Sequence, residues 1–161
     1  MKHTLSVLVE DEPGVLSRVA GLFSGRGFNI ISLNVAPTLE KNTSLMTIVT
    51  EGDEQIIEQI IKQLRKLITV IKVVDMNTVK TVEREMILIK VNAQDSARAE
   101  ILRIVDIFRC KVVDVSPSEI TIEATGNSEK LSALINLLQK FGIKEVARTG
   151  IVAMKRSMQL P

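Results

Sequence analysis

The strongest constraint on the fold is an apolar pattern that occurs twice in the chain. The stretch from Thr47 to Gly52 (TIVTEG) resembles the stretch from Thr121 to Gly126 (TIEATG) at an offset of 74 residues. A stripe of apolar residues at helical spacing follows each copy at the same offset: Ile57, Ile60, Ile61, Leu64 and Leu67, and then Leu131, Leu134, Ile135, Leu138 and Phe141. Such a repeat predicts two related domains, and a chain of 161 residues is long enough for two small ones.

The first half of the chain has the element order β-α-β-β-α-β. Alternating or β-branched apolar residues predict four strands, over residues 4–9, 28–35, 45–50 and 70–74. One amphipathic helix is expected to start with Pro13 in its first turn and to end near Gly27. The second helix is expected to begin after Asp53, a good N-cap residue.

The second half repeats this order after a short linker at residues 75–81. Its predicted strands cover residues 86–91, 112–115, 120–124 and 144–154, and its predicted helices carry the apolar stripes of residues 101–108 and 131–141. The fold class is therefore α+β, with two ferredoxin-like βαββαβ domains in tandem, residues 1–77 and 78–161. Each sheet is expected to be antiparallel, with both of its helices on one face.

The loop at residues 10–14 is the most distinctive candidate for a binding site. Gly14 has no side chain, so a ligand can approach its backbone closely, and the helix that follows has free N–H groups and a partial positive charge at its start. These properties suit a carboxylate. The alternative is a plain strand-to-helix turn. The corresponding loop of the second half, residues 92–96, lacks the Pro-Gly pair, so no site is expected there.

The sequence predicts no catalytic residues and no metal site. His3 is the only histidine and is expected on an edge strand, which excludes metal sites built on several histidines. Cys110 is the only cysteine, so no disulfide can form within the chain, as is typical of a reducing compartment. Arg109 and Lys111 beside it are cations that can lower a thiol pKa, but we interpret Cys110 as a small residue at a strand start.

Composition argues against nucleic-acid and membrane partners. The net charge is only +2 and the chain has no Trp or Tyr, so it lacks a basic footprint and aromatic platforms for bases. No apolar run reaches the length of a membrane span. The N-terminus leads directly into a strand without the apolar core of a signal peptide, so we expect a cytoplasmic protein.

The first loop and its surroundings resemble a known family. Residues 5–23 (LSVLVEDEPGVLSRVAGLF) look like the start of an ACT domain, a βαββαβ module that binds amino acids. Residues 26–38 (RGFNIISLNVAPT) resemble the regulatory small subunit of acetohydroxyacid (acetolactate) synthase. The resemblance continues through the second half, at residues 82–85, 107–109, 113–115 and 147–152. It covers essentially the whole chain.

This resemblance implies a regulatory rather than a catalytic role. In the family, a catalytic large subunit carries thiamine diphosphate, a divalent metal (Mg²⁺) and FAD, and makes the precursors of valine, leucine and isoleucine. The small subunit binds none of these cofactors and has no activity alone. It raises the activity of the large subunit and confers feedback inhibition by valine, which binds where two ACT domains join in a homodimer.

The resemblance also implies the effector-binding residues: Asp11, Gly14, Val15, Leu16, Asn29, Ile30 and Ile31. Backbone N–H groups of Gly14, Val15 and Leu16 are expected to hold the carboxylate, and the Asn29 amide is expected to reach the ligand from the second strand. Asp11 stands where valine-sensitive relatives often carry Asn, and Leu45 stands where relatives often carry Arg. Asp accepts from an ammonium but cannot donate to a carboxylate, which leaves the identity of the effector open.

Three alternatives remain at this stage. A stand-alone amino-acid sensor without an enzyme partner shares the ACT argument. An acylphosphatase-like enzyme shares the fold, but the chain has no suitable phosphate loop. An RNA-binding module of the RRM type also shares the fold, but the strand aromatics that stack bases are missing.

Overall fold

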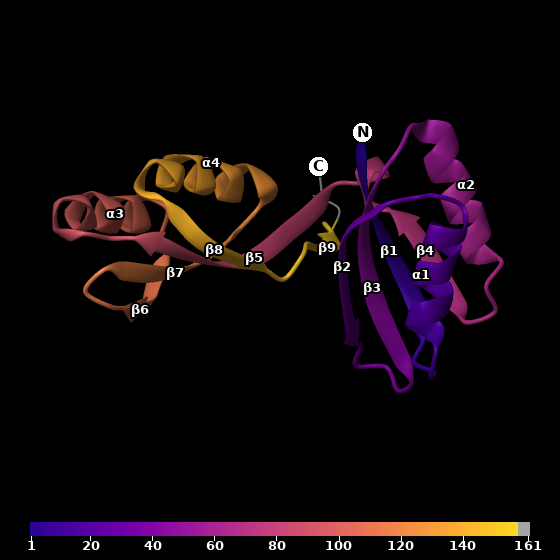
Figure 1. Ribbon diagram of the computed structural model, residues 1–161. Helices are drawn as coiled ribbons and strands as arrows, with labels where there is room; N and C mark the ends of the chain where they lie inside the picture. The colour runs from indigo at the N-terminus through magenta and orange to yellow at the C-terminus, as the bar shows by residue number, and fades with distance from the viewer. Residues whose placement is uncertain (158–161) are drawn as a thin grey trace. The chain divides into compact units, whose positions relative to one another are not determined.

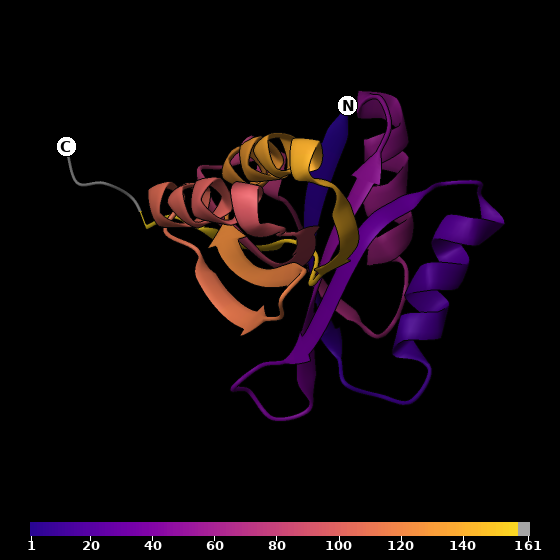
Figure 2. The same cartoon turned by 60° about the vertical axis from the view of Figure 1, so that its left-hand side comes forward.

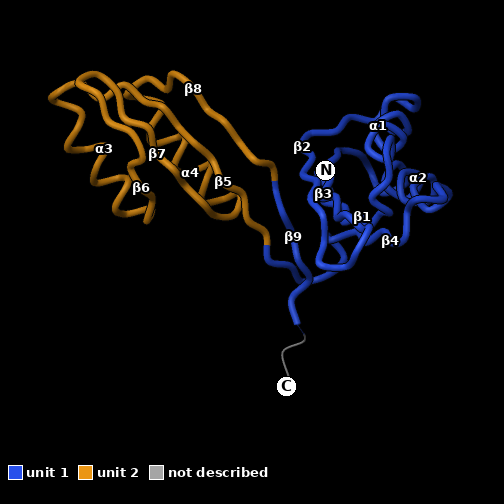
Figure 3. Tube along the Cα trace, turned by 90° about the horizontal axis from the view of Figure 1, so that it is seen from below, with its two compact units in different colours: residues 1–82, 151–161 blue, residues 83–150 orange. Residues whose placement is uncertain are grey.

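The computed structural model describes residues 1–157 and divides the chain into two compact units. The first unit contains residues 1–82 and the segment that begins at Ile151, and the second contains residues 83–150 (Figure 3). The C-terminal segment belongs to the first unit, whereas the sequence-based division assigned it to a domain of residues 78–161. A backbone hydrogen bond from the Arg156 N–H to the Lys80 carbonyl, at 2.8 Å, attaches it there. Residues 158–161 of that predicted domain lie outside the described residues.

The first unit has the predicted β-α-β-β-α-β order. Its elements are β1 (Lys2–Glu10), α1 (Val15–Gly25), β2 (Ile30–Pro37), β3 (Thr43–Glu51), α2 (Glu54–Arg65) and β4 (Val70–Asp75), followed by the short 3₁₀ helix η1 (Met76–Thr78). The sheet is antiparallel with the strand order β2-β3-β1-β4, and both helices cover one face of it (Figures 1 and 2). This confirms the predicted fold class for the first half.

The core of the first unit lies between that sheet and its helices. Alternate residues of β1 face the helices because side chains along a strand alternate between its two faces. The fully or almost fully buried members of the core come from β1, β3 and both helices: Leu5, Val7, Val9, Met46, Ile48, Val19, Phe23, Ile60 and Leu64. Apart from the ring of Phe23 and the thioether of Met46, these core side chains are aliphatic.

The second unit repeats the arrangement. Its elements are β5 (Thr81–Asn92), α3 (Asp95–Ile107), β6 (Lys111–Val115), β7 (Glu119–Gly126), α4 (Ser128–Leu138), the 3₁₀ helix η2 (Gln139–Phe141) and β8 (Ile143–Arg148). The strand order β6-β7-β5-β8 corresponds to β2-β3-β1-β4 of the first unit. The predicted apolar helix residues Leu131, Leu134 and Leu138 are completely buried in this core.

The repeat extends to the residues that start the second helix of each unit. Asp53 caps α2 by accepting a hydrogen bond from the Ile56 N–H at 2.9 Å, and Asn127 caps α4 by accepting from the Lys130 N–H at the same distance. Gly52 and Gly126 precede these caps, and a Cβ at either position would lie within 2.7 Å of a side chain one helical turn ahead. The two halves share the same spacing of glycine, N-cap residue and apolar helix residues. This shared spacing therefore has a local cause, the lack of room for a Cβ and the hydrogen bond at the N-cap.

Three details differ from the sequence-based expectations. Pro13 precedes α1 in a turn, instead of lying in its first helical turn, because Gly14 is the N-cap. The strand expected over residues 144–154 is two strands, β8 and β9 (Val152–Lys155), because Gly150 has φ = +82° and turns the chain between them. The strand β1 is not an edge strand, since β3 and β4 pair with its two sides.

Candidate functional site

The loop between β1 and α1 is built around Gly14. This residue is the N-cap of α1 and has φ = +86°, a left-handed conformation that glycine adopts without steric cost. The first helical hydrogen bond runs from the Arg18 N–H to the Gly14 carbonyl, at 3.0 Å. A Cβ added at Gly14 would meet no atom within 4 Å, so the space in front of the helix start is open.

The free donors at this helix start differ from those expected. The Val15 N–H donates to the Glu12 carbonyl at 3.2 Å, so it closes the turn and is not available to a ligand in this geometry. The N–H groups of Leu16 and Ser17 have no acceptor inside the helix, as in any first turn, and no side chain caps this end. Ser17 is therefore a donor that sequence reasoning missed; the position of the N-cap at Gly14 is the signal that identifies it.

The loop is held to the rest of the unit by its backbone. The Glu10 N–H donates to the Thr69 carbonyl, and the Asp11 N–H donates to the Asn42 carbonyl, both at 2.8 Å. The side chain of Asp11 remains exposed at the surface. These two bonds tie the loop to the connections before β4 and before β3, which fixes the position of the open helix start.

The residues expected at the start of the second strand lie there in the structure. Asn29 is exposed and immediately precedes β2, where its carbonyl accepts from the Thr50 hydroxyl at 2.7 Å. Ile30 packs against the core, whereas Ile31 is 39% exposed. The Asn29 side chain is thus available to a ligand, and Ile31 offers an apolar surface beside it.

The structure does not bring Asn29 and Gly14 together within one chain. Ile30 is in register with Thr50, which pairs with His3 near the start of β1, whereas the Gly14 loop follows Glu10 at the end of β1. The rise of a strand is about 3.3 Å per residue, so roughly 20 Å separate the two groups along the sheet. A ligand that contacts both must therefore use Asn29 from a second copy of the chain.

Cys110, the one cysteine of the chain, lies between α3 and β6. The thiol is partly buried just before β6, and burial raises its pKa while the charge of Lys130 lowers it to a smaller extent. The charge that lowers the thiol pKa is that of Lys130, not that of the sequence neighbours Arg109 and Lys111.

Within residues 1–157, no group of three or more His, Cys, Asp or Glu side chains is placed to hold a metal ion.

The one histidine also lies differently from the expectation. His3 is 6% exposed, because β1 is an inner strand, and its Nδ1 atom lies 3.2 Å from Oδ2 of Asp75 at the end of β4.

Among the helices of the described residues, none is long and apolar enough to cross a membrane.

Comparisons with known proteins identify the family. The family model described as "AHAS small subunit-like ACT domain" matches residues 5–72, and the one described as "Small subunit of acetolactate synthase" matches residues 84–157. The probable acetolactate synthase small subunit of Archaeoglobus fulgidus is 56% identical over 97% of this chain and 98% of its own length. The acetolactate synthase small subunit of Aquifex aeolicus is 55% identical over 99% of this chain and 83% of its own length.

A solved structure agrees with these sequence matches. The acetolactate synthase small subunit from Thermotoga maritima superposes with a TM-score of 0.87 at 44% sequence identity and covers 99% of both chains. Each family model matches one half of the chain, and the relatives and this structure match both halves together. The chain therefore belongs to the acetolactate synthase small-subunit family, and its first half is an ACT domain.

Proposed function

We propose that this protein is the regulatory subunit that activates a catalytic acetolactate synthase large subunit and makes it sensitive to valine. Membership in a small-subunit family implies a large-subunit partner and places the chain in branched-chain amino-acid synthesis. The thiamine diphosphate, Mg²⁺ and FAD of the reaction belong to that partner, in the cytoplasm. The observation that carries the effector site is the open helix start at Gly14, whose free N–H groups suit the carboxylate of an amino acid.

A homodimer through β2 completes this site. The strand β2 is at the edge of its sheet and exposes Ile31 and Val35, each 39% accessible, so it presents both unpaired backbone groups and apolar side chains. If two β2 strands pair antiparallel, the start of one lies beside the end of the other. Pro37, at the end of β2, is in register with Ser44, which pairs with Val9 next to the Gly14 loop. Asn29 of the second copy then reaches the Gly14 loop of the first.

In this dimer, one amino acid contacts both chains. The Leu16 and Ser17 N–H groups and the partial positive charge of α1 bind the carboxylate. The carbonyl oxygen of the Asn29 amide accepts from the ammonium, and the Asp11 carboxylate attracts the same group. Ile31 supplies an apolar surface for an aliphatic side chain, which favours valine over polar amino acids.

Valine regulates the partner only if it binds one conformation of the complex better than another. Couplings of this kind are typically about 1–3 kcal/mol. Because the ligand bridges two chains, its binding rigidifies the dimer and changes how the dimer docks on the large subunit. Hydrogen exchange of the dimer and its affinity for the large subunit, both measured with and without valine, test this step.

The function is tested by acetolactate formation. The large subunit is assayed alone and with this protein, across a valine titration, for the wild type and for Gly14→Asp, Asn29→Ala and the control Gly21→Ala. We expect activation by all four proteins and valine inhibition only by the wild type and the control. Activation without valine inhibition in the wild type would retain the partner and reject valine as effector. No activation by folded protein would favour a stand-alone amino-acid sensor.

Mixing the two site variants tests the shared site directly. A mixed dimer of Gly14→Asp and Asn29→Ala chains has one intact site, composed of the unchanged Gly14 of one chain and the unchanged Asn29 of the other. We expect the mixture to recover part of the valine inhibition that each variant alone lacks. If the mixture remained insensitive, Gly14 and Asn29 would not form one site across the dimer.

A further inference from the structure

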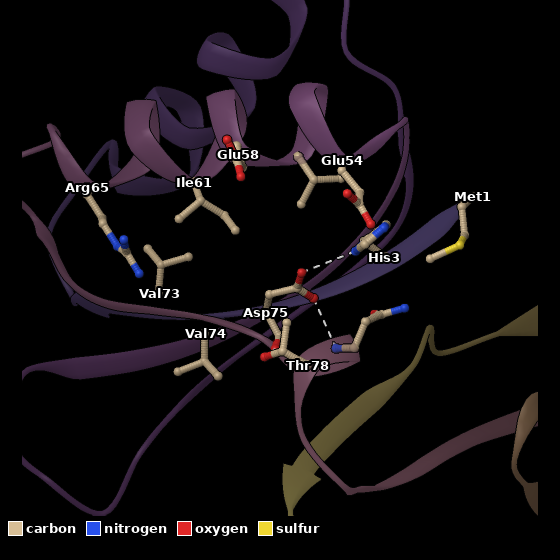
Figure 4. A pocket seen from close by; sticks show the side chains of 12 residues that line it. Met1, His3, Glu54, Glu58, Ile61, Arg65, Val73, Val74, Asp75 and Thr78 are labelled. Carbon is tan, nitrogen blue, oxygen red and sulfur yellow. Dashed lines mark hydrogen bonds and ion pairs between the residues drawn. The ribbon is translucent and has the colours of Figure 1, made fainter.

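The first unit contains a cavity that is separate from the Gly14 loop. Its volume is about 580 Å³, within the range of small-molecule sites. It lies between α2, β4, η1 and the beginning of β1, and its lining residues, Met1 and His3 among them, come from these segments (Figure 4). No residue of the loop at positions 10–14 lines it, so the valine site proposed above does not account for it.

The polar centre of this cavity is the ring of His3. The side chain is only 7% exposed, and Nδ1 lies 3.2 Å from Oδ2 of Asp75. An ionised carboxylate can only accept, so in the neutral form of the ring Nδ1 carries the hydrogen and Nε2 is an acceptor. Nε2 is buried and has no hydrogen-bond partner among residues 1–157. A buried acceptor without a partner destabilises the fold by about 1–3 kcal/mol, so a hydrogen bond from a ligand N–H to this atom is favourable.

The His3–Asp75 pair is itself held firmly. The other oxygen of Asp75 accepts from the Asn77 N–H at 3.0 Å. The Asn77 side chain bonds to β1 on both sides of His3, because its amide oxygen accepts from the Thr4 N–H at 2.9 Å and its NH₂ donates to the Lys2 carbonyl at 3.1 Å. These bonds fix the imidazole of His3, which is one of the lining residues, and so hold the buried Nε2 in place behind the cavity wall.

The charged lining of the cavity contains the carboxylates of Glu54, Glu58 and Asp75 and the guanidinium of Arg65, and Met1 brings the N-terminal ammonium to the same lining. Glu54 and Glu58 lie one helical turn apart on α2 and line the same side of the cavity. Neither carboxylate takes part in an ion pair within residues 1–157. Arg65 is the one guanidinium of the lining and lies nearly two turns beyond Glu58. The apolar part of the lining comes from Ile57, Ile61 and Val73.

We propose that this cavity is a second ligand site and binds a small protonated amine with an apolar tail. The side chains that cover Nε2 of His3 move aside, an ammonium N–H then donates to this atom, and the carboxylates of Glu54 and Glu58 attract the charge. The tail lies against Ile57, Ile61 and Val73. A carboxylate ligand does not fit, because it has no hydrogen to give to Nε2 and is repelled by the two glutamates. The proposal does not depend on the valine site or on the large subunit.

The single histidine makes the site directly observable. Because the chain has one histidine, its ring-proton signals identify themselves in an NMR spectrum of the full chain. The probe is n-butylammonium chloride, titrated at about pH 8 and constant total salt. The matched probe is n-butyltrimethylammonium, which has the same charge and tail without an N–H donor, and n-butyrate tests the opposite charge.

We expect a saturable shift of the His3 signals with n-butylammonium, weaker binding of the trimethyl probe and no binding of butyrate. The double variant Glu54→Gln/Glu58→Gln is expected to bind n-butylammonium about tenfold more weakly, since two exposed carboxylates supply part of the attraction. The control Glu40→Gln, on the exposed β2–β3 connection, should bind like the wild type.

Equal affinities for both ammonium probes would refute the hydrogen bond to Nε2. An unsaturable shift, or no shift, would mean that only water satisfies His3. An unchanged affinity of the double variant for n-butylammonium would show that the two glutamates do not contribute to binding. Both glutamates are exposed, so the double variant is expected to fold. An unchanged thermal unfolding transition would show that it does.

Discussion

Arg148 on β8 holds the buried carboxylate of Glu85 on β5 by two parallel hydrogen bonds, Nε to Oε1 at 2.8 Å and Nη2 to Oε2 at 3.0 Å. The Glu85 side chain is 5% exposed and that of Arg148 is 49% exposed. The bonds to Glu85 raise the pKa of Arg148. A carboxylate this deeply buried needs a charged partner, so the pair fixes β8 beside β5 at the end of the strand.

We expect Arg148→Met to lower the free energy of unfolding by about 2 kcal/mol. Breaking a fully buried pair typically costs about 3–5 kcal/mol because it leaves an unpaired charge, and the exposed half of this guanidinium reduces the effect. The control Arg103→Met, on the exposed side of α3, should change stability by less than about 0.5 kcal/mol. Urea denaturation measures both, and equal effects of the two variants would show that the Glu85 pair is not important for stability.

The pair of Glu119 and Lys144 predicts a dependence on acid pH. The hydrogen bond from Lys144 is the main cause that lowers the pKa of Glu119 from its ordinary value of 4.5. A carboxyl with a lowered pKa in the folded state contributes stability above its ordinary pKa, and that contribution is lost as the pH falls through the folded-state value.

Lys144→Met is therefore expected to be less stable than the wild type near neutral pH, and the difference should shrink in acid. The free energy of unfolding of both proteins, measured from about pH 7 to 3, tests this sign. A difference that grew towards acid pH would contradict the direction of the Glu119 shift.

Two glycines of the same region are expected to respond oppositely to alanine. Gly14 has φ = +86°, so Gly14→Ala forces an L-residue into the left-handed region and should destabilise the fold by about 1 kcal/mol. Gly21 lies inside α1 with no atom within 4 Å of an added Cβ, so Gly21→Ala should stabilise it by about 0.5–1 kcal/mol. Thermal unfolding measures the stability of each variant against the wild type. If Gly14→Ala stabilised the protein, the loop would have to relax to another conformation.

Cys110 is expected to react slowly with iodoacetamide near neutral pH. Burial raises the pKa of its thiol, and the thiolate is the reactive form. Mass spectrometry of the modified chain gives the rate, with a cysteine peptide of ordinary pKa as the reference. Lys130→Gln removes the charge that opposes the shift and should slow the reaction further. A rate above that of the peptide would identify Cys110 as an activated thiol after all.

The sequence by itself determined the features that depend on neighbours along the chain. The apolar stripes after Gly52 and Gly126 gave the second helix of each unit, and the residues Asp53 and Asn127 cap those helices in the structure. The βαββαβ order and the fold class followed from the same local patterns, whereas the family followed from the resemblance of residues 5–23 and 26–38 to known sequences. Periodicity works for these features because a helix or strand buries one face whatever element covers it.

Only the tertiary structure decided which strands pair and which groups meet. It made β1 an inner strand and so buried His3 against Asp75, 72 positions away in the chain. It also engaged the Val15 N–H in the turn and placed Asn29 at the opposite end of the sheet from Gly14. Strand order and register arise from backbone hydrogen bonds between distant segments, and no local pattern specifies the partner.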